Sequence, residues 1–554
     1  MEKRVVIAIV ICIGILFAWM KIFPPPTAPT PAPNADKSSA ATAPAAATPS
    51  NVPVPGTAAA AGSAGAEAAA AANRPEELVE LITPAVRFVL SSHGGTLRQA
   101  QLRAPKYLMR KGDPGSGLDL VATSAAGFSP LRTEFPKAGF APPSDGAWTV
   151  TRPAADTVAF EFVSDAVRIE KKYRAEPESY RLLLDITVEN KTDKPVDHDL
   201  SLHVYGHQNP DQKGGSFLSG SSANPASVIC EVGDKAERRS VEKVAKERLE
   251  KTGNVLWAGT DDKFFLLAAI PFPESPPHER TCAGTSPAPD VGDVSLLFGE
   301  RTVAPHASTT YPFIVFAGPK IREDLEKISP NGEDARLHEA IDVNLAILSR
   351  PILSLLKFFQ SFVGNWGVAI ILLTVFIRLL TFYPTQRSLL SAKKMQKLAP
   401  KMAAIRKKYE NDKQRQSVET MNLYKAHGVS PFGGCLPSLI QMPIWIALYS
   451  TLNYAVELYR SPFILHIHDL TAKDPYYITP LLMGGVMFAQ MRMSPASPDQ
   501  QQQQMMAVMM PIMFTAFSLV LPSGLALYML TSYLIGILQQ LYVNHVDRKA
   551  SATA

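Results

Sequence analysis

The sequence predicts a polytopic α-helical membrane protein that carries a β-rich soluble domain in the middle of the chain. A basic start followed by an apolar stretch at residues 5–20 predicts a first membrane helix. Residues 76–316 then show short apolar runs with the two-residue period of strands. After residue 364, five further apolar segments have about the length of membrane helices. At 554 residues, the chain therefore exceeds one ordinary domain.

Residues 1–23 are predicted to form an N-terminal membrane anchor. Lys3 and Arg4 precede the uncharged stretch 5–20, which is near the lower length limit for a spanning helix. A cleaved signal peptide is the alternative. Because the Ala-rich sites that suit a signal peptidase follow the prolines at 24–26, far from the apolar stretch, we expect an uncleaved anchor.

The composition of residues 24–73 predicts a disordered tether. Of these 50 residues, 20 are Ala and 10 are Pro, and large apolar side chains are almost absent. Such a segment buries too little apolar surface to offset the entropy lost on ordering.

Residues 74–335 predict a β-rich domain. Strand-like runs cover residues 86–91, 96–103, 157–163 and 180–190. Apolar side chains alternate along two of these runs, as expected for a sheet with one buried face: Phe160, Phe162, Leu182, Leu184, Ile186 and Val188. We therefore expect one large sandwich. The charged, Pro-free stretch 233–251 predicts an added helix.

Four cysteines are too few for a disulfide scaffold. Cys12 and Cys435 lie in apolar segments, where they are expected to act as small buried hydrophobes. Cys230 and Cys282 lie in the β-rich region and could pair if that region is extracytoplasmic. Their spacing says nothing about geometry, so the bridged and the reduced states both stay open.

The C-terminal half predicts one interfacial helix and a five-helix core. Residues 336–363 mix apolar side chains with Arg350 and Lys357, which suits an amphipathic helix in the membrane interface. The core, 364–543, is followed by a short tail at 544–554. Its five expected spans are 366–383, 435–456, 476–491, 505–521 and 525–543. Pro522, Ser523 and Gly524 join the last two spans as a tight hairpin.

The loop 384–430 fixes the expected orientation. It contains 11 Lys or Arg and 3 acidic residues, whereas the loop 457–475 contains 2 and 3. The positive-inside rule therefore places 384–430 and both termini in the cytoplasm and the β-rich domain outside. Apolar residues at helical spacing predict a helical hairpin in this basic loop: Met395, Leu398, Met402, Ile405, Tyr409, Val418, Met421 and Tyr424.

A series of motifs in this half resembles the YidC family of membrane protein insertases. In chain order, the motifs are Gly364-Asn365-Trp366-Gly367, Arg378, Pro400-Lys401-Met402, Gly433-Gly434-Cys435-Leu436-Pro437, Gln441-Met442-Pro443 and Pro522-Ser523-Gly524-Leu525. The resemblance covers residues 342–543. In the soluble half, Ser92-His93-Gly94-Gly95-Thr96-Leu97 and residues 311–320 resemble the large periplasmic domain of Gram-negative members.

This resemblance implies a fold and a function. The expected fold is five transmembrane helices around a water-accessible groove open to cytoplasm and lipid, with a periplasmic β-supersandwich. The expected function is to insert, fold and help assemble inner-membrane proteins of a Gram-negative bacterium, alone or with a Sec translocon. The implied partners are nascent membrane proteins, membrane lipid and the ribosome, through the basic loop. Tail-based ribosome docking is not expected, because 544–554 has only Arg548 and Lys549 as basic residues.

Arg378 is the central candidate site residue. A helix that enters at Trp366 places it about 18 Å down the span, toward the cytoplasmic side. A snorkelling side chain that reaches the headgroups is one reading. The other reading, which the resemblance supports, is that this cation attracts the acidic or polar tail of an incoming chain.

Polar residues on the expected helices complete the candidate groove: Thr374, Gln441, Tyr528 and Ser532. Ordinary interhelical hydrogen bonding, worth about 1 kcal/mol, is the alternative for each of them. Family members often have two successive Tyr where this chain has Tyr528 and Met529, so one groove contact is not matched. Ten of the 17 Met residues lie between 483 and 529, either as an adaptable client surface or as gap-filling in the core.

The sequence lacks the motifs that would indicate a catalytic function. The chain has no Walker A motif, no His-Glu-x-x-His pair, and no His in the spans beside Ser523 to serve a protease. His466 and His468 lie in a loop that the family also shows, so neither a metal nor a cofactor is expected. The remaining alternatives are a secondary transporter or channel, and a membrane-tethered periplasmic carbohydrate-active enzyme. The latter needs carboxylates that converge in the β-rich domain, and sequence alone does not place them.

Overall fold

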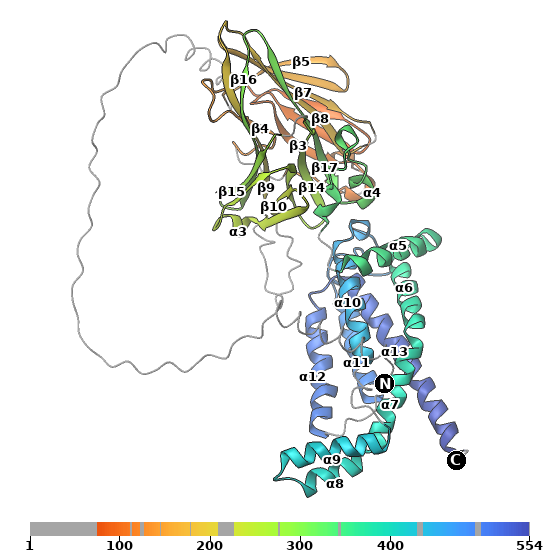
Figure 1. The fold of residues 1–554 in the computed structure, drawn as a ribbon. Helices are drawn as coiled ribbons and strands as arrows, with labels where there is room; N and C mark the ends of the chain where they lie inside the picture. The colour runs from red at the N-terminus through yellow and green to blue at the C-terminus, as the bar shows by residue number, and fades with distance from the viewer. Residues whose placement is uncertain are drawn as a thin grey trace, which may run out of the picture. The chain divides into compact units, whose positions relative to one another are not determined.

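A computed structural model describes residues 75–110, 113–121, 127–143, 146–177, 179–208, 226–274, 278–341, 345–428, 436–493 and 500–552. The anchor, the tether, Cys12 and Cys435 that the sequence predicts lie outside these residues. A β-rich region precedes a helical region in the described chain (Figure 1).

The β-rich region contains seventeen strands among its described residues. They are β1 (Leu78–Ile82), β2 (Val86–Ser91), β3 (Thr96–Leu102), β4 (Arg132–Glu134), β5 (Thr149–Ala154), β6 (Thr157–Val163), β7 (Val167–Ala175), β8 (Arg181–Asn190), β9 (Val196–His207), β10 (Ser227–Val232), β11 (Lys235–Ser240), β12 (Leu249–Gly253), β13 (Val255–Asp261), β14 (Phe265–Pro271), β15 (Arg280–Ala288), β16 (Val291–Val303) and β17 (Ser308–Pro319). The short helices α3 (Val241–Val244) and α4 (Arg322–Leu325) accompany them.

These strands form three antiparallel sheets. The orders are β1-β2-β3, then β11-β10-β13-β14-β17-β8-β7-β6-β5, and β12-β15-β16-β9-β4. The apolar alternation along β8 is confirmed, because Leu182, Leu184, Ile186 and Val188 are all fully buried in one core cluster. The predicted strands 86–91 and 157–163 coincide with β2 and β6.

The helix predicted for residues 233–251 is wrong. This stretch forms β11, the four-residue helix α3 and β12 instead. β11 pairs with β10 as the edge strand of the nine-stranded sheet, and β12 pairs with β15. Charged residues are common on edge strands, so the composition that suggested a solvated helix suits a sheet edge equally well.

Cys230 and Cys282 form a disulfide. Cys230 lies on β10 and Cys282 on β15, so the bond joins the nine-stranded sheet to the five-stranded sheet. Both residues are fully buried. Of the two states that the sequence left open, the structure contains the bridged one.

The helical region begins after the β-rich region in the chain. Its helices are α5 (Ala346–Val363), α6 (Trp366–Leu380), α7 (Phe382–Lys397), α8 (Ala399–Lys408), α9 (Lys413–Ala426), α10 (Leu436–Tyr454), α11 (Ile478–Met493), α12 (Gln500–Ser518) and α13 (Ser523–Ala552). Each of the five predicted spans coincides with one of these helices, but several boundaries differ.

The first predicted core span ends early. α6 stops at Leu380, and α7 continues from Phe382 at an angle of 61° to it. Pro384 lies in the first turn of α7, where a missing backbone N–H costs little and the residue before Pro disfavours a continuous helix. At the other end of the core, α13 continues to Ala552 and includes most of the predicted tail.

Fewer helices of the structure meet the length and hydropathy expected of a membrane span than the five spans predicted from the sequence. Among the described residues, Ala346–Val363 and Ser523–Val546 are long and apolar enough to cross a membrane, and the bent pair α6–α7 can count as a third span. α5, predicted as interfacial, is therefore also long enough to span. A shorter apolar helix covers Ala507–Ser518 within α12.

The predicted helical hairpin in the basic loop is confirmed as α8 and α9, which lie side by side (Figure 1). Leu398, Met402 and Tyr424 form a small buried cluster between them. Asp412 caps α9, because its carboxylate accepts a hydrogen bond from the backbone N–H of Arg415. Val418 and Met421, also expected inside the hairpin, are exposed.

Close helix contacts in the core depend on glycine. A Cβ on Gly484 of α11 would overlap Oγ1 of Thr515 on α12. A Cβ on Gly536 of α13 would overlap Nε2 of Gln490 on α11. Small residues at helix interfaces let backbones approach, and van der Waals packing then drives association in lipid.

We expect loss of the disulfide to destabilise the β-rich region. The Cys230→Ala/Cys282→Ala variant frees a loop of sequence separation 52, which the chain-entropy relation values at about 4 kcal/mol. The urea midpoint of protease resistance in detergent should fall accordingly. The Cys12→Ala/Cys435→Ala variant is the control and should keep the wild-type midpoint. Equal midpoints for both variants would contradict a structural role of the bond.

We expect Gly484→Ala to disturb the packing of α11 on α12 at a cost of about 1–3 kcal/mol, because its methyl group overlaps Thr515. A Cβ on the adjacent Gly485 would meet nothing within 4 Å, so Gly485→Ala is a matched control. Thermal aggregation of the two purified variants measures the difference. Identical aggregation temperatures would show that α11 and α12 are not in close contact.

Candidate functional site

Two of the family-like motifs fasten helix ends to the loop between α10 and α11. Asn365 caps α6 by accepting the backbone N–H of Val368, and its amide donates to the carbonyl of Phe463 at 3.1 Å. Gly367 leaves room for the ring of Phe463, which a Cβ at this position would overlap. This motif therefore positions the start of α6, the helix that carries Arg378.

The Pro522-Ser523-Gly524-Leu525 motif contacts the same loop from the start of α13. The Ser523 hydroxyl donates to the carbonyl of Asp469 at 2.8 Å, and the Gly524 N–H donates to the carbonyl of Leu470 at 2.9 Å. The two motifs thereby hold α6 and α13 against one loop. Because α6 and α13 also pack on each other, their register is fixed at this end.

Arg378 of α6 contacts Ser532 of α13. Its Nε donates to the Ser532 hydroxyl at 2.9 Å, and Nη2 donates to the same oxygen. In the part of the chain that the structure describes, Arg378 forms no ion pair with a carboxylate. A partly buried guanidinium that is held by one hydroxyl keeps most of its charge uncompensated.

Gln441 of α10 contacts Tyr528 of α13. The Gln441 amide donates to the Tyr528 hydroxyl at 3.0 Å. Tyr528 lies four residues before Ser532, so both contacts occupy one face of α13. Both Tyr528 and Ser532 are buried. The structure therefore brings four of the five predicted site residues together along α13.

Thr374 is placed differently. It lies one turn before Arg378 on α6 and is buried, but its hydroxyl donates to the carbonyl of Ile370 in its own helix at 2.6 Å. This back-bonding satisfies the hydroxyl without another helix. The hydroxyl hydrogen of Thr374 is therefore already used within α6 in this arrangement.

Gln539 extends the polar face and was not predicted from the sequence. It is buried on α13, and its amide donates to the carbonyl of Phe382 at 3.2 Å, where α7 begins. Tyr528, Ser532 and Gln539 are separated by four and seven residues, which is the spacing of one helix face. This period was the signal that could have identified Gln539.

Some methionines lie in the helical core and others on its surface, which corresponds to the two alternatives of gap-filling and an adaptable client surface. Met483 and Met529 are buried in the helical core, as gap-filling requires. Met509 and Met513, by contrast, are 53% and 54% exposed on α12. These two side chains belong to an exposed apolar surface, where flexible thioethers suit varied contacts.

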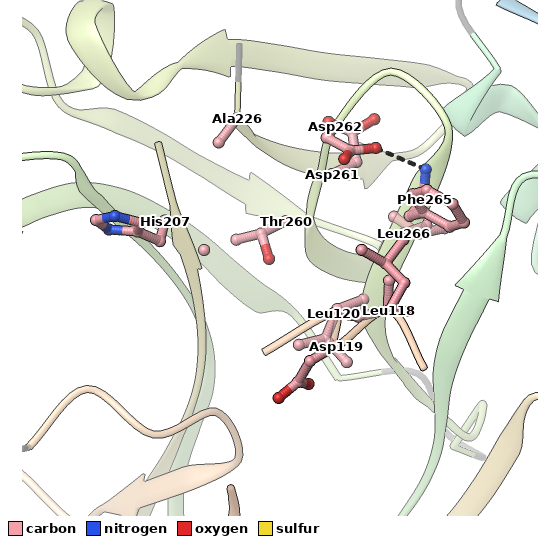
Figure 2. Close-up of a pocket in the computed structure, with 12 residues that line it drawn as sticks. Leu118, Asp119, Leu120, His207, Ala226, Thr260, Asp261, Asp262, Phe265 and Leu266 are labelled. Carbon is pink, nitrogen blue, oxygen red and sulfur yellow. Dashed lines mark hydrogen bonds between the residues drawn. The ribbon is translucent and has the colours of Figure 1, made fainter. Parts of the chain in front are cut away.

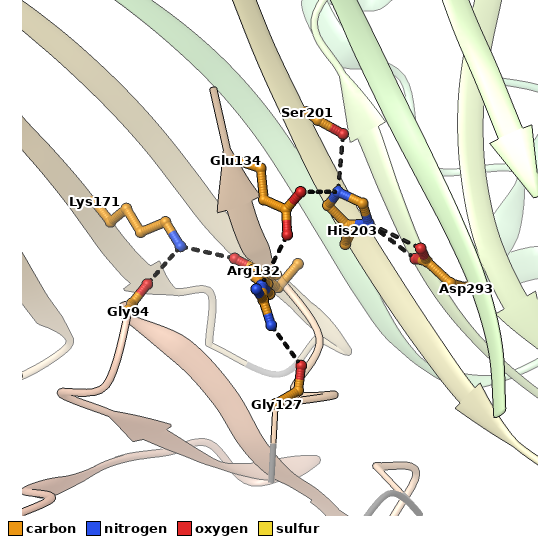
Figure 3. A network of polar contacts seen from close by, with 9 residues as sticks. Gly94, Gly127, Arg132, Glu134, Lys171, Ser201, His203 and Asp293 are labelled. Carbon is orange, nitrogen blue, oxygen red and sulfur yellow. Dashed lines mark hydrogen bonds and ion pairs between the residues drawn. The ribbon is translucent and has the colours of Figure 1, made fainter. Parts of the chain in front are cut away.

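In the β-rich region, the Gly94-Gly95 turn is built around a buried lysine (Figure 3). The Lys171 ammonium donates to the carbonyls of Gly94 at 2.8 Å, Gly95 at 3.3 Å and Leu131 at 2.7 Å. Both glycines have positive φ, which they adopt without steric cost. Burial, with a further contribution from Arg132, lowers the pKa of Lys171 well below its usual value. The glycine motif is therefore structural.

A Ser–His–Asp arrangement lies on the five-stranded sheet (Figure 3). The His203 Nε2 is 3.0 Å from the Ser201 hydroxyl, and its Nδ1 is 3.0 Å from Oδ2 of Asp293. Glu134 approaches the same Nε2 at 3.7 Å. Carboxylates thus converge here, but Ser201 is only 3% exposed, so its hydroxyl is closed to a substrate.

A cavity of about 110 Å³ lies elsewhere in the β-rich region (Figure 2). Each of the three aspartates in its wall already accepts bonds from the fold. Asp119 accepts the N–H groups of Ala100 and Val121, Asp261 pairs with Lys320, and Asp262 accepts the N–H groups of Phe264 and Phe265. Burial raises the pKa of Asp119. These carboxylates therefore do not form a free acid–base pair of the kind a glycosidase uses.

The predicted absence of a metal concerns His466 and His468. His466 Nε2 lies 3.2 Å from Oδ2 of Asp474, which also accepts the backbone N–H of Thr479. Within the described residues, no group of three or more His, Cys, Asp or Glu side chains is placed to hold a metal ion.

Comparisons with known proteins cover both regions. A family model described as YidC periplasmic domain matches residues 78–355, and one described as 60Kd inner membrane protein matches residues 358–550. Among curated proteins, a membrane protein insertase YidC from Anaeromyxobacter dehalogenans (strain 2CP-C) is 35% identical over 561 residues, which cover 100% of this chain and 99% of the relative. Another, from Citrifermentans bemidjiense, is 35% identical over 551 residues, or 98% of this chain and 99% of the relative.

Solved structures are more distant. A crystal structure of an active YidC insertase is 20% identical and covers 83% of this chain and 92% of its own, with a TM-score of 0.35. A galactose mutarotase-like protein from Lactobacillus casei is 10% identical and covers 44% of this chain and 100% of its own, with a TM-score of 0.33. On the two family models and the full-length identity to curated relatives, this chain belongs to the YidC family of membrane protein insertases.

Proposed function

We propose that this chain inserts and folds inner-membrane proteins through a polar groove formed by α6, α10 and α13. The observation that carries the proposal is Arg378, which is partly buried among apolar helices and held by the Ser532 hydroxyl without a carboxylate partner in the described residues. A buried charge of this kind is costly, so it is expected to serve a function.

Arg378 acts on the incoming chain by attraction. A polar or acidic tail that enters the groove exchanges water for the guanidinium and for the hydroxyls of Tyr528 and Ser532. Coulomb attraction strengthens as water is excluded, so the tail is stabilised part of the way across the bilayer. The chain needs no nucleotide for this step, because the attraction lowers the barrier directly.

Short helices lower the barrier to insertion in a second way, by thinning the bilayer beside them. α11 has 16 residues and reaches about 24 Å, and the apolar part of α12, Ala507–Ser518, is shorter still. The hydrocarbon core is about 30 Å thick. We infer that the bilayer thins beside α11 and α12, so that a client crosses less hydrocarbon there.

α5 is proposed to lie in the interface rather than to span, although its length permits both. It turns away from α6 at Gly364, whose φ is +67° (Figure 1). Ile347 and Phe362 are 82% and 72% exposed, whereas Lys357 pairs with Glu457 of the α10–α11 loop at 2.7 Å. A helix with an apolar exposed face and an anchored lysine suits the headgroup boundary.

The remaining features of the family resemblance are proposed in the same way. The α8–α9 hairpin faces the cytoplasm and carries the basic side chains that meet the ribosome or anionic lipid. Both termini are cytoplasmic, the β-rich domain is a periplasmic supersandwich, and a Sec translocon is a partner for some clients. The positive-inside distribution of the loops supports the orientation.

We expect Arg378→Ala to reduce insertion of clients with acidic translocated tails about tenfold more than that of neutral clients, which corresponds to about 1.4 kcal/mol of lost attraction. Arg378→Lys, which keeps the charge, should restore most of the acidic-tail activity. Protease protection of radiolabelled clients in proteoliposomes measures both. If acidic and neutral clients are impaired equally, Arg378 is a snorkelling side chain and the proposed attraction is wrong.

We expect insertion to fall at least about threefold when one turn, Leu-Ala-Leu-Ala, is added within α11, because a span about 6 Å longer relieves the mismatch that thins the bilayer. The same four residues added within residues 24–73 are the control for chain length. Folding is checked by abundance and detergent stability. Normal insertion by a stable lengthened variant would leave the polar groove as the sole source of activity.

A further inference from the structure

The last part of the β-rich region lies as a strap on one face of the nine-stranded sheet. The strap is residues 321–341 and includes α4. Its buried apolar side chains, Leu325, Ile328, Ala335, Leu337 and Ala340, pack on sheet residues that include Ile229, Trp257 and Phe316. A hydrogen bond from Arg238 Nη2 of β11 to the carbonyl of Ala340, 2.6 Å long, holds its end. The strap is the final segment of this region before α5 in the chain.

Under this strap lies an acidic side chain that accepts no hydrogen bond from the described residues. Glu231 of β10 is fully buried, and within the described chain neither of its carboxylate oxygens has a hydrogen-bond partner. Its neighbour across the sheet, Trp257 of β13, is also buried, and its indole Nε1 likewise has no partner among these residues. A buried ionised carboxylate usually requires two or more donors, so this environment favours the neutral acid.

One cation of the strap approaches Glu231. The Arg336 Nε lies 3.4 Å from Glu231 Oε1, while Nη1 pairs with the exposed Asp234. Arg336 has a φ of +54°, a left-handed conformation that costs a non-glycine residue free energy of order 1 kcal/mol or more. The contact of Arg336 with Asp234 does not depend on the charge of Glu231, so it persists when Glu231 is protonated.

We propose that Glu231 and Arg336 form a pH-responsive latch, in which protonated Glu231 lets the strap lie tightly on the sheet and ionised Glu231 loosens it. Loosening exposes the apolar face of the sheet that the strap covers. The latch would respond to the pH of the compartment that holds the β-rich domain.

The charges around Glu231 give the direction of the effect. Burial raises the pKa of Glu231 to about 7 from an ordinary value of 4.5; Arg336 opposes this, and the carboxylates of Glu339 and Asp234 add to it. His338 of the strap pairs with Glu339 at 3.4 Å, and Arg238 of β11 pairs with Asp261 of β13 at 2.8 Å. The pKa of Glu231 is higher in the folded state than in the unfolded state. Its contribution to the stability of the docked strap is therefore fully present below about pH 4.5 and is lost as the pH rises through about 7.

Hydrogen–deuterium exchange of the full chain in lipid nanodiscs tests the latch. With exchange corrected for the intrinsic pH dependence, we expect residues 322–341 to exchange about tenfold faster at pH 8.5 than at pH 5.5. Glu231→Gln keeps the size of the side chain and remains neutral, so its strap should change less than about twofold. Glu237→Gln, on the neighbouring strand β11, is the matched control and should behave as the wild type.

A second variant guards against a folding defect in Glu231→Gln. Arg336→Gln removes the opposing cation, so the midpoint of the pH-dependent exchange should move to higher pH. β1 and β2 report on overall folding in each sample. A wild-type strap with equal exchange at both pH values, exchange that slows as pH rises, or a Glu231→Gln strap with the wild-type pH dependence would each overturn the latch.

Discussion

The proposed insertion groove depends on one constraint: a guanidinium among apolar helices must be hydrogen-bonded, yet it must stay available to a client. Ser532 meets both requirements, because a hydroxyl can accept from Arg378 and carries no charge that would cancel it. A carboxylate at the same place would form a buried ion pair and leave little attraction for a client. The positions of α6 and α13 follow from this contact and from the loop that fixes their ends.

That loop, between α10 and α11, explains why the family-like motifs occur where they do. Gly367 makes room for Phe463, and Ser523 and Gly524 bond to carbonyls of the same loop. Among the described residues no hydrogen bond joins them to Arg378, yet they help to set where α6 and α13 begin. A motif can therefore be specific to a function while its own role is to fix a helix register.

The sequence predicted the parts of the fold that depend on local pattern. Strands β2 and β6 and the α8–α9 hairpin were predicted because period and turn chemistry determine them. The tight hairpin expected at Pro522, Ser523 and Gly524 differs, because α13 already begins at Ser523. The stretch 233–251 was predicted as a helix wrongly, since pairing with β10 and β15 overrides its local preference. The Cys230–Cys282 bond, which joins two sheets, was beyond any local pattern. At the candidate site, the sequence indicated Arg378 as a cation in an apolar segment, and its functional role stays a prediction. The internal hydrogen bond of Thr374 depends on side-chain rotamers, which local pattern does not determine.

The described residues compensate buried charges in three ways, and under the proposed mechanism only one of these ways suits a client. Lys171 is surrounded by three carbonyls, and Lys320 shares Asp261 with Arg238, so both ammonium groups are satisfied by the fold itself. Among the described residues, Glu231 has one cation at 3.4 Å and no hydrogen-bond donor, which leaves protonation as its way to lower the free energy. Arg378 keeps its proton at physiological pH, so in the proposed mechanism a negative or polar group of the client supplies the compensation that the described residues do not. A substrate that brings such a group is stabilised to the extent that the resting protein leaves the charge uncompensated.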